Sequence, residues 1–411
     1  MPDKKKIAII TNGAFPVPAV RGGAVEALVE MILGQNEKYR EAEITVFSIY
    51  DELALKAGTK YPSIHFEFVR PEKAGVSADR FLHYIAADLL KRNDHLAFKT
   101  IFQRLSFLYQ TAVKINETHY DRLIFENQMA SLWILKYKDN QKKYAGKYYF
   151  HLHNHPAKYA GAEELVKESR RIICVSSFIG HAFAKNIGDA YDGRYAVLTN
   201  VVDENLFDPE SVTEDQKQSV IDKLQVGNRK VILFLGRLME GKGVRELLQA
   251  YQKIADDSNV LVVVGSFNFN DSTHSPYEDE LNRLINEIGR EHIIFTGYVN
   301  HDEVPAYYQI ADVVCMPSTC EDAAPLAVIE CLRMQKPLIT TTMGGIPEYA
   351  DSSCAVMLEN DEHLVEHIAE SLTDLLNNPE KCALMSENAG RVSQSRTLSS
   401  YYHNLLEILE L

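Results

Sequence analysis

The sequence predicts an α/β protein of two doubly wound, Rossmann-like domains that face each other across a cleft. With 411 residues, the chain is long for one domain and sufficient for two. Short apolar runs alternate with longer helical patterns in both halves, which is typical of parallel sheets covered by helices. A polar stretch, 208–225, follows the last apolar run of the first half. We therefore expect domains at 1–198 and 199–394, followed by a terminal helical segment at 395–411.

The apolar runs are the predicted strands, and the loops after them are where doubly wound sheets bind ligands. In the first half the runs are 7–11, 44–49, 122–125, 148–152, 172–176 and 195–198. In the second half they are 230–235, 260–264, 292–295, 313–316 and 338–341. A long helix is expected over 79–116, with polar positions that include Lys91, Arg92, Lys99 and Arg104.

Charge is distributed unevenly along the chain. The formal net charge of −14 argues against general nucleic-acid binding. Residues 1–200 contain 28 Lys and Arg against 22 Asp and Glu, whereas the remainder contains 15 against 35. Two interpretations stay open: the halves face different partners, or the imbalance is solvated surface charge without a role.

The protein is expected to be cytoplasmic. Its six cysteines form no CxxC pair and most lie in apolar runs, which suits reduced, buried thiols better than disulfides or a zinc site. The first residues lack a signal-peptide pattern, and no apolar stretch approaches the roughly 20 residues that span a bilayer. Peripheral contact with the inner face of an anionic membrane is left open.

Two glycine-containing loops follow predicted strands. Gly22 and Gly23 precede a helical pattern, where paired glycines let the backbone approach a ligand and free N–H groups attract phosphate. A plain flexible turn is the alternative there. In the second half, Arg237 and Lys242 lie in a loop with three glycines. Two cations in such a loop can bind one diphosphate, arginine as a planar fork and lysine as a point charge.

Carboxylates cluster in and after the loop that begins at Pro317. Glu321 and Asp322 lie in the loop, Pro325 is placed to open the next helix, and Glu330 lies in that helix. Two such carboxylates can bind hydroxyl groups of one ligand while N–H groups at the helix start receive its phosphate. Helix capping is the alternative role for the loop acids. Glu330 has apolar neighbours, so its carboxylate would be costly without a ligand.

Three alternating histidines, His151, His153 and His155, lie at the end of a predicted strand. In an extended strand they share one face, but the outer two lie roughly 13 Å apart. A three-histidine metal site would therefore require a sharp bend. We expect no metal and favour a histidine that contacts a ligand.

Together these residues resemble retaining glycosyltransferases of the GT-B fold, specifically glycosyltransferase family 4, and are similar to its spore-coat-associated and capsule-type members. The resemblance covers nearly the whole length and is strongest over 232–250 and 295–349. Further matching segments are 16–24, 175–178, 200–203, 207–209 and 344–348. No single segment is decisive, but their ordered series is highly specific.

The resemblance implies how the donor phosphates are bound. Four residues would surround the donor diphosphate: Gly22, Gly23, Arg237 and Lys242. Pro325 stands where many members have glycine and offers no N–H group. Phosphate contacts at that helix start would therefore come from its neighbours Leu326 and Ala327.

The resemblance also implies the sugar, ribose and base contacts. Glu330 matches the second acid of the family's E-x7-E pattern and would bind the donor ribose. Asp322 occupies the position of the first acid, where the family usually has Glu, so Asp322 and Glu321 are alternatives for the sugar contact. His153 would contact the transferred sugar, and Tyr298 would lie near the base.

The implied reaction is transfer with retention of anomeric configuration from a nucleotide diphosphate sugar, with UDP expected, and with neither a metal nor another cofactor. The acceptor is left open between a glycan, a lipid-linked acceptor and a protein, in surface polysaccharide or glycoconjugate biosynthesis. The final helix is expected to cross back to the first domain. Alternatives are a nucleotide-sugar epimerase, a phosphorylase, and a nucleotide-sugar sensor or inactive partner subunit.

Overall fold

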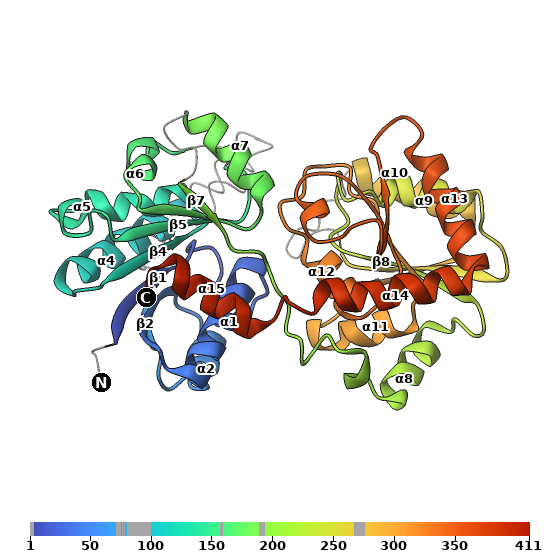
Figure 1. Ribbon diagram of the computed structural model, residues 1–411, viewed down its shortest axis with the longest axis horizontal. Helices are drawn as coiled ribbons and strands as arrows, with labels where there is room; N and C mark the ends of the chain where they lie inside the picture. The colour runs from blue at the N-terminus through green and yellow to red at the C-terminus, as the bar shows by residue number, and fades with distance from the viewer. Residues whose placement is uncertain are drawn as a thin grey trace. The chain divides into compact units, whose positions relative to one another are not determined.

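The computed structural model describes residues 4–70, 75, 77, 79, 100–156, 159–188, 194–266 and 276–411. The chain divides into two compact units, which we call unit 1 (Met1–Thr199 with Leu398–Leu411) and unit 2 (Asn200–Thr397). Each unit contains one parallel β-sheet with helices packed on it (Figure 1). These two doubly wound sheets confirm the predicted fold class.

The sheet of unit 1 has seven strands in the order β3-β2-β1-β4-β5-β6-β7, and every neighbouring pair is parallel. The strands are Lys5–Ile10 (β1), Ala42–Ile49 (β2), His65–Val69 (β3), Arg122–Glu126 (β4), Tyr148–Leu152 (β5), Arg171–Cys174 (β6) and Tyr195–Val197 (β7). The helices are Ala24–Tyr39 (α1), Glu52–Gly58 (α2), Ile101–Glu117 (α4), Met129–Lys136 (η3), Asn140–Lys143 (α5), Glu163–Lys167 (α6), Ser177–Ile187 (α7) and Leu398–Ile408 (α15). The strand order reverses between β1 and β4, and the carboxyl ends of strands at such a point form the usual ligand site of these sheets.

The sheet of unit 2 has six parallel strands in the order β10-β9-β8-β11-β12-β13. The strands are Lys230–Leu235 (β8), Asn259–Val264 (β9), Ile293–Gly297 (β10), Val313–Met316 (β11), Leu338–Thr341 (β12) and Ala355–Leu358 (β13). The helices are Pro209–Ser211 (η5), Glu214–Leu224 (α8), Val244–Gln252 (α9), Pro276–Ile288 (α10), His301–Glu303 (η6), Val304–Ile310 (α11), Leu326–Arg333 (α12), Ile346–Glu348 (η7), Leu364–Asn377 (α13) and Pro379–Ser393 (α14). Here the order reverses between β8 and β11, so the loops after these two strands are neighbours.

Local sequence explains where these elements form. Every residue of β5 and of β9 is buried, as expected for strands that helices cover on both faces. Helix α7 begins after Ser176, whose hydroxyl accepts a hydrogen bond from the Ile179 N–H group. Helix α8 begins with a capping box, in which Thr213 and Gln216 exchange side-chain and backbone hydrogen bonds.

The final helix, α15, packs within unit 1 on α1, as expected (Figure 1). The Tyr402 hydroxyl donates to Asn36 Oδ1 over 2.7 Å, and both residues are fully buried. Beyond the helix, the Leu409 carbonyl accepts a hydrogen bond of 2.8 Å from Arg122 Nε at the start of β4. The last residues of the chain therefore complete the core of the first unit.

Some elements differ from the prediction. The edge strands β3 and β13 were not predicted. In β3 the polar residues His65 and Glu67 interrupt the apolar run, whereas β13 is a continuous apolar run of four residues that the prediction did not include. The single helix expected over 79–116 is wrong, because Thr100 has non-helical angles (φ −143°, ψ 23°) and precedes α4. Asp79 instead accepts hydrogen bonds from the N–H groups of Phe102 and Gln103. Of the polar positions named in that helix, Lys91, Arg92 and Lys99 lie outside the described residues.

Replacing Tyr402 by Phe should destabilise unit 1, because it removes the hydrogen bond to Asn36 from a buried site. We expect a loss of about 1 kcal/mol, which lowers the melting temperature of a unit of this size by about 2–4 °C. Differential scanning calorimetry of the full chain measures the shift. The matched control is Tyr109→Phe, the same change at a side chain that is 58% exposed; an equal shift in the control would contradict the prediction.

Candidate functional site

The glycine-rich loop after β8 lies directly against the loop after β11. The Gly241 carbonyl accepts hydrogen bonds from the N–H groups of Thr319 (2.9 Å) and Cys320 (3.1 Å). Gly243 has φ +77°, and a Cβ atom there would lie 1.9 Å from the Pro317 carbonyl oxygen. No residue except glycine allows this approach without displacement of the backbone. The glycines of the loop after β8 therefore bring two loops of unit 2 together.

This packing joins a cation to a carboxylate. Lys242 Nζ forms an ion pair with Asp322 Oδ2, although the two residues are 80 positions apart. The side chains of Lys242 and Asp322 are 24% and 13% exposed, so the pair is partly shielded from solvent. Arg237, in the same loop as Lys242, is exposed, and its side chain has no partner in the described part of the chain.

The loop after β11 also positions the start of α12. The Asp322 carbonyl accepts a hydrogen bond of 2.7 Å from Gly345 N–H. Pro325 does not open the helix as expected but is its N-cap residue, with φ −71° and ψ 114°. Helical geometry therefore begins at Leu326, and the N–H groups of Leu326 and Ala327 have no intrahelical acceptor. Two N–H donors thus lie at the helix end that attracts anions.

Glu330, in α12, is only 5% exposed and has partners within the protein. Its Oε1 atom lies 3.0 Å from His301 Nε2, and its Oε2 atom lies 3.1 Å from the Tyr308 hydroxyl. The hydrogen bond to Glu330 raises the pKa of His301. Burial raises the pKa of Tyr308 well above its usual range. The expectation that the buried carboxylate needs a ligand was therefore incomplete, because His301 and Tyr308 already stabilise it.

The remaining residues assigned to the donor are distributed over both units. Gly22 and Gly23, with φ +77° and +105°, precede α1 in unit 1. A Cβ atom on Gly23 would lie 2.1 Å from Glu26 Oε2, and burial raises the pKa of Glu26. In unit 2, Glu321 is exposed in the loop after β11, and Tyr298 is 59% exposed just after β10.

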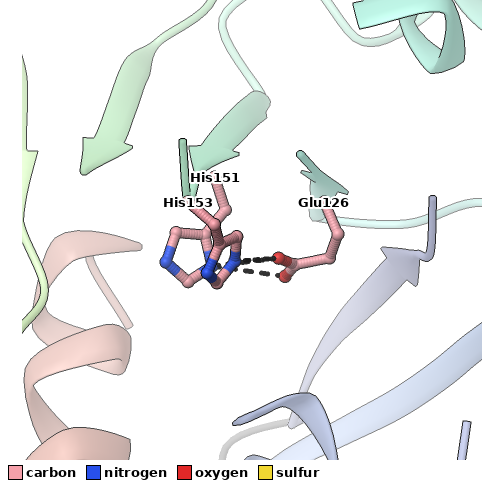
Figure 2. A group of neighbouring side chains, drawn as sticks. All are labelled: Glu126, His151 and His153. Atoms are coloured by element: carbon pink, nitrogen blue, oxygen red, sulfur yellow. Dashed lines mark hydrogen bonds and ion pairs between the residues drawn. The ribbon is translucent and has the colours of Figure 1, made fainter. Parts of the chain in front are cut away.

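In unit 1, His151 and His153 converge on Glu126 (Figure 2). Glu126 ends β4 and is paired in register with His151 on β5. Glu126 Oε2 lies 2.9 Å from His153 Nε2 and 3.1 Å from His151 Nδ1. His155 is not in this group, because it contacts Asn186 at 2.6 Å.

The three side chains are buried and electrostatically coupled. Burial alone would raise the pKa of Glu126, but the charge and hydrogen bonds of His151 and His153 lower it to about 2. Burial, together with His151, lowers the pKa of His153 to about 4. Among the described residues, these are the three side chains whose donor atoms, all within 4.8 Å of one another, could hold a metal ion.

Sequence reasoning found the motif positions but missed Glu126, His301 and Tyr308. Glu126 and His301 lie 25 to 29 positions from the residues that they contact. Only the sheet order and the placement of η6 bring them there, and no spacing in a single sequence indicates it. The one available signal for Glu126 was an acidic residue directly after an apolar run, at the carboxyl end of a predicted strand.

Residues 215–392 match the family model described as Glycosyl transferases group 1. Over 419 aligned residues, the chain is 25% identical to spore coat protein SA of Bacillus subtilis, covering 98% of this chain and 99% of that protein. It is 28% identical over 226 residues to a GDP-mannose-dependent alpha-(1-6)-phosphatidylinositol monomannoside mannosyltransferase of Mycobacterium tuberculosis, covering 53% of this chain and 55% of the relative.

Among solved structures, the chain is similar to Anabaena Alr3699/HepE in complex with UDP-glucose. The TM-score is 0.74 at 18% sequence identity, and the match covers 99% of each chain. At this identity the likeness concerns the fold. Of the helices in the described part of the chain, none is both long and apolar enough to cross a membrane.

Replacing Gly243 by Ala should open the contact between the two loops of unit 2, because its Cβ atom would overlap the Pro317 carbonyl. The matched control is Gly227→Ala, since Gly227 also has a positive φ (+62°) but no atom within 4 Å of the added Cβ. We expect the control to lose about 1 kcal/mol from backbone strain, and Gly243→Ala to lose about 2–4 kcal/mol because overpacking adds to that strain. Equal losses of unfolding free energy in the two variants, measured by thermal unfolding, would contradict the assigned contact.

Proposed function

We propose, from the premise that this chain is a glycosyltransferase with a glycosyl transferases group 1 domain at residues 215–392, that its donor is a nucleoside diphosphate sugar. We assign it to family 4 of the GT-B enzymes, with transfer that retains the anomeric configuration and uses no metal. UDP is the proposed nucleotide. The acceptor is a glycan, a lipid-linked molecule or a protein.

The observation that carries the proposal is the ion pair between Lys242 and Asp322. The two residues lie in the loops after β8 and β11, which are neighbouring parallel strands. A cation and a carboxylate therefore lie side by side at the carboxyl end of the sheet, and the loop after β8 that carries Lys242 also carries the exposed Arg237. A diphosphate sugar offers both matching groups, since its phosphates suit cations and its vicinal hydroxyls suit carboxylates.

Donor binding is proposed to exchange these partners. Lys242 leaves Asp322 for the diphosphate and, together with Arg237, neutralises the charge that develops on the leaving group. Asp322 then accepts hydrogen bonds from hydroxyls of the sugar, with Glu321 as the alternative acceptor. The two cationic side chains stabilise the negative charge of the diphosphate leaving group, which a metal ion does in other enzymes.

Glu330 is proposed to bind the ribose. His301 and Tyr308 hold its carboxylate in place before the donor arrives, so little side-chain ordering is needed on binding. The N–H groups of Leu326 and Ala327, at the start of α12, are proposed to receive a phosphate oxygen.

The remaining assignments follow the family. Gly22 and Gly23 are proposed to lie near the diphosphate, Tyr298 near the base, and His153 against the transferred sugar. The acceptor hydroxyl attacks the anomeric carbon on the face from which the diphosphate leaves. A donor phosphate oxygen takes the hydroxyl proton, so the bond to the acceptor oxygen forms as the bond to the phosphate oxygen breaks, and the configuration is retained.

Replacing Arg237 by Ala should weaken donor binding and slow transfer, because one of the two cations at the diphosphate is lost. The control is Arg283→Ala, an exposed arginine in unit 2 whose ion-pair partner among the described residues is Glu287 on its own helix. The full chain and both variants are titrated with UDP, GDP, ADP, TDP and their sugar conjugates in EDTA, and melting is followed by fluorescence. Saturation at about 100 times Kd should stabilise the wild type by about 2.7 kcal/mol.

We expect one nucleotide family to stabilise the wild type and Arg283→Ala, but Arg237→Ala much less. The rate of transfer by Arg237→Ala should fall by roughly 100- to 1000-fold. Near-normal turnover by Arg237→Ala would refute its role. Donor binding without transfer to any acceptor would instead favour a nucleotide-sugar sensor.

A lipid-linked acceptor at an anionic membrane surface is supported by one face of α4. Phe102, Leu105 and Tyr109 recur at helical spacing and are 40% to 58% exposed. The Tyr109 ring also packs edge-on against Tyr137, and Lys138 Nζ lies 5.2 Å from the centre of the Tyr137 ring. An apolar face beside a basic side chain is the combination that binds anionic lipid surfaces.

Vesicles of anionic lipid should therefore sediment the protein at low salt, and vesicles of neutral lipid should not. Replacing Phe102 and Leu105 by Ser should reduce the bound fraction at least about tenfold, because two apolar contacts with the lipid are lost. The control is Leu384→Ser, which changes a leucine that is 58% exposed in unit 2. Failure of the wild type to sediment would remove the membrane from the proposal.

A further inference from the structure

Glu126, His151 and His153 form one buried array at the carboxyl ends of β4 and β5 (Figure 2). The exposed fractions of the three residues are 1%, 1% and 6%. Asn127, the next residue after β4, fixes the backbone around it: its N–H group donates to the His151 carbonyl (2.8 Å), and its Oδ1 accepts from His153 N–H (3.0 Å). These backbone hydrogen bonds fix His151 and His153, the residues before and after Leu152, so that both rings face the Glu126 carboxylate.

The chemistry of a carboxylate determines which ring nitrogens carry protons. An ionised carboxylate only accepts hydrogen bonds, so each nitrogen that faces Glu126 must be an N–H donor. His151 presents Nδ1, which lies 3.1 Å and 3.4 Å from the two carboxylate oxygens. His153 presents Nε2, at 2.9 Å. Each ring therefore carries a proton on the nitrogen that faces Glu126, which is Nδ1 in His151 and Nε2 in His153.

A metal ion would require the reverse arrangement. The nitrogens that face Glu126 would be unprotonated ligands, and each ring would need an acceptor for the N–H group on its other nitrogen. His151 Nε2 is buried and has no such partner among the described residues. A metal-bound His151 would leave a buried N–H group unpaired, which is rarer and costlier than an unpaired lone pair. The hydrogen-bonded array fits the surroundings better than a metal site.

We propose that Glu126 is a positioning residue that fixes His153 as its Nε2–H tautomer, so that Nδ1 is the acceptor it offers to a hydroxyl of the transferred sugar. His151 donates the second hydrogen bond that keeps the carboxylate ionised in a buried site. This rests on the proposed function only where it assigns His153 to the sugar. Glu126 itself does not touch the substrate.

Imidazole ¹⁵N spectra of the full chain, labelled at histidine, test the tautomers without any substrate. The variants His151→Gln and His153→Gln assign the two rings among the 14 histidines. We expect a proton on Nδ1 of His151 and on Nε2 of His153, an unprotonated Nδ1 of His153 at pH 7, and spectra unchanged by EDTA. Unprotonated nitrogens facing Glu126, together with stoichiometric zinc in the purified chain, would overturn the proposal.

Glu126→Gln keeps the shape of the side chain and removes its charge. We expect the ring N–H signals of both histidines to move upfield or to be lost by exchange, because a charge-assisted hydrogen bond is replaced by a weaker one. The matched control is Glu67→Gln, since Glu67 also accepts from a histidine, His65 Nε2 at 3.0 Å, but at an exposed position in the same unit. Unchanged His153 signals in Glu126→Gln would overturn the positioning role.

Kinetics separate positioning from simple packing. With the donor identified, Glu126→Gln should lower kcat by roughly 10- to 100-fold, because a misoriented contact is lost at the reacting sugar; the donor KM should change much less. In the His153→Gln background the same change should cost nearly nothing further, because Glu126 acts through that ring. Full additivity of the two losses would overturn the proposal. Absence of transfer by the wild type would refute the proposed function, while the spectra still decide whether Glu126 fixes His153.

Discussion

The contact between the backbone at Gly243 and the Pro317 carbonyl constrains the whole candidate donor site of unit 2. The contact requires glycine at position 243. Together with the two hydrogen bonds to the Gly241 carbonyl, it fixes the loop after β8 against the loop after β11. Because these loops are fixed, Lys242 meets Asp322. The ion pair is therefore a consequence of close backbone packing at the point where the strand order reverses.

Buried carboxylates form the second common feature. Glu330 in unit 2 and Glu126 in unit 1 are nearly inaccessible, and each accepts hydrogen bonds from histidine. A buried charge without partners would be expensive, and it would normally be avoided by protonation. The imidazole and phenol groups offset that cost and hold each carboxyl group in a fixed orientation. Such groups suit the recognition of hydroxyls, because a fixed acceptor needs little reorganisation when its ligand binds.

The sequence predicted the interior of both sheets well, because strands covered on both faces are continuous apolar runs. Strands β8 and β11 have the predicted bounds. The edge strand β3 was missed because His65 and Glu67 interrupt that signal, whereas β13 is a short apolar run that the prediction did not include. Thr100 interrupts a helix whose periodicity alone favoured continuity.

The candidate site was predictable only in part. The loops that follow strands could be located, and with them the positions of Lys242, Asp322 and Glu330. Their partners could not, since the pairing of Glu126 with His151 depends on the register of two strands, and that of Glu330 with His301 on the placement of a neighbouring helix. The alternation of histidines suggested a shared face for three residues, whereas the chain after β5 directs His155 to Asn186.

The central claim is that Lys242 exchanges Asp322 for the donor diphosphate, and that Asp322 then binds the sugar. Isothermal titration calorimetry of the free nucleoside diphosphate and of its sugar conjugate, on the full chain and on Asp322→Asn, tests it most directly. The nucleoside diphosphate should bind Asp322→Asn at least as tightly as the wild type, because Lys242 is no longer paired, while the affinity added by the sugar should disappear. The exchange would be contradicted if the sugar still added affinity in Asp322→Asn, or if Asp322→Asn bound the free nucleoside diphosphate more weakly than the wild type.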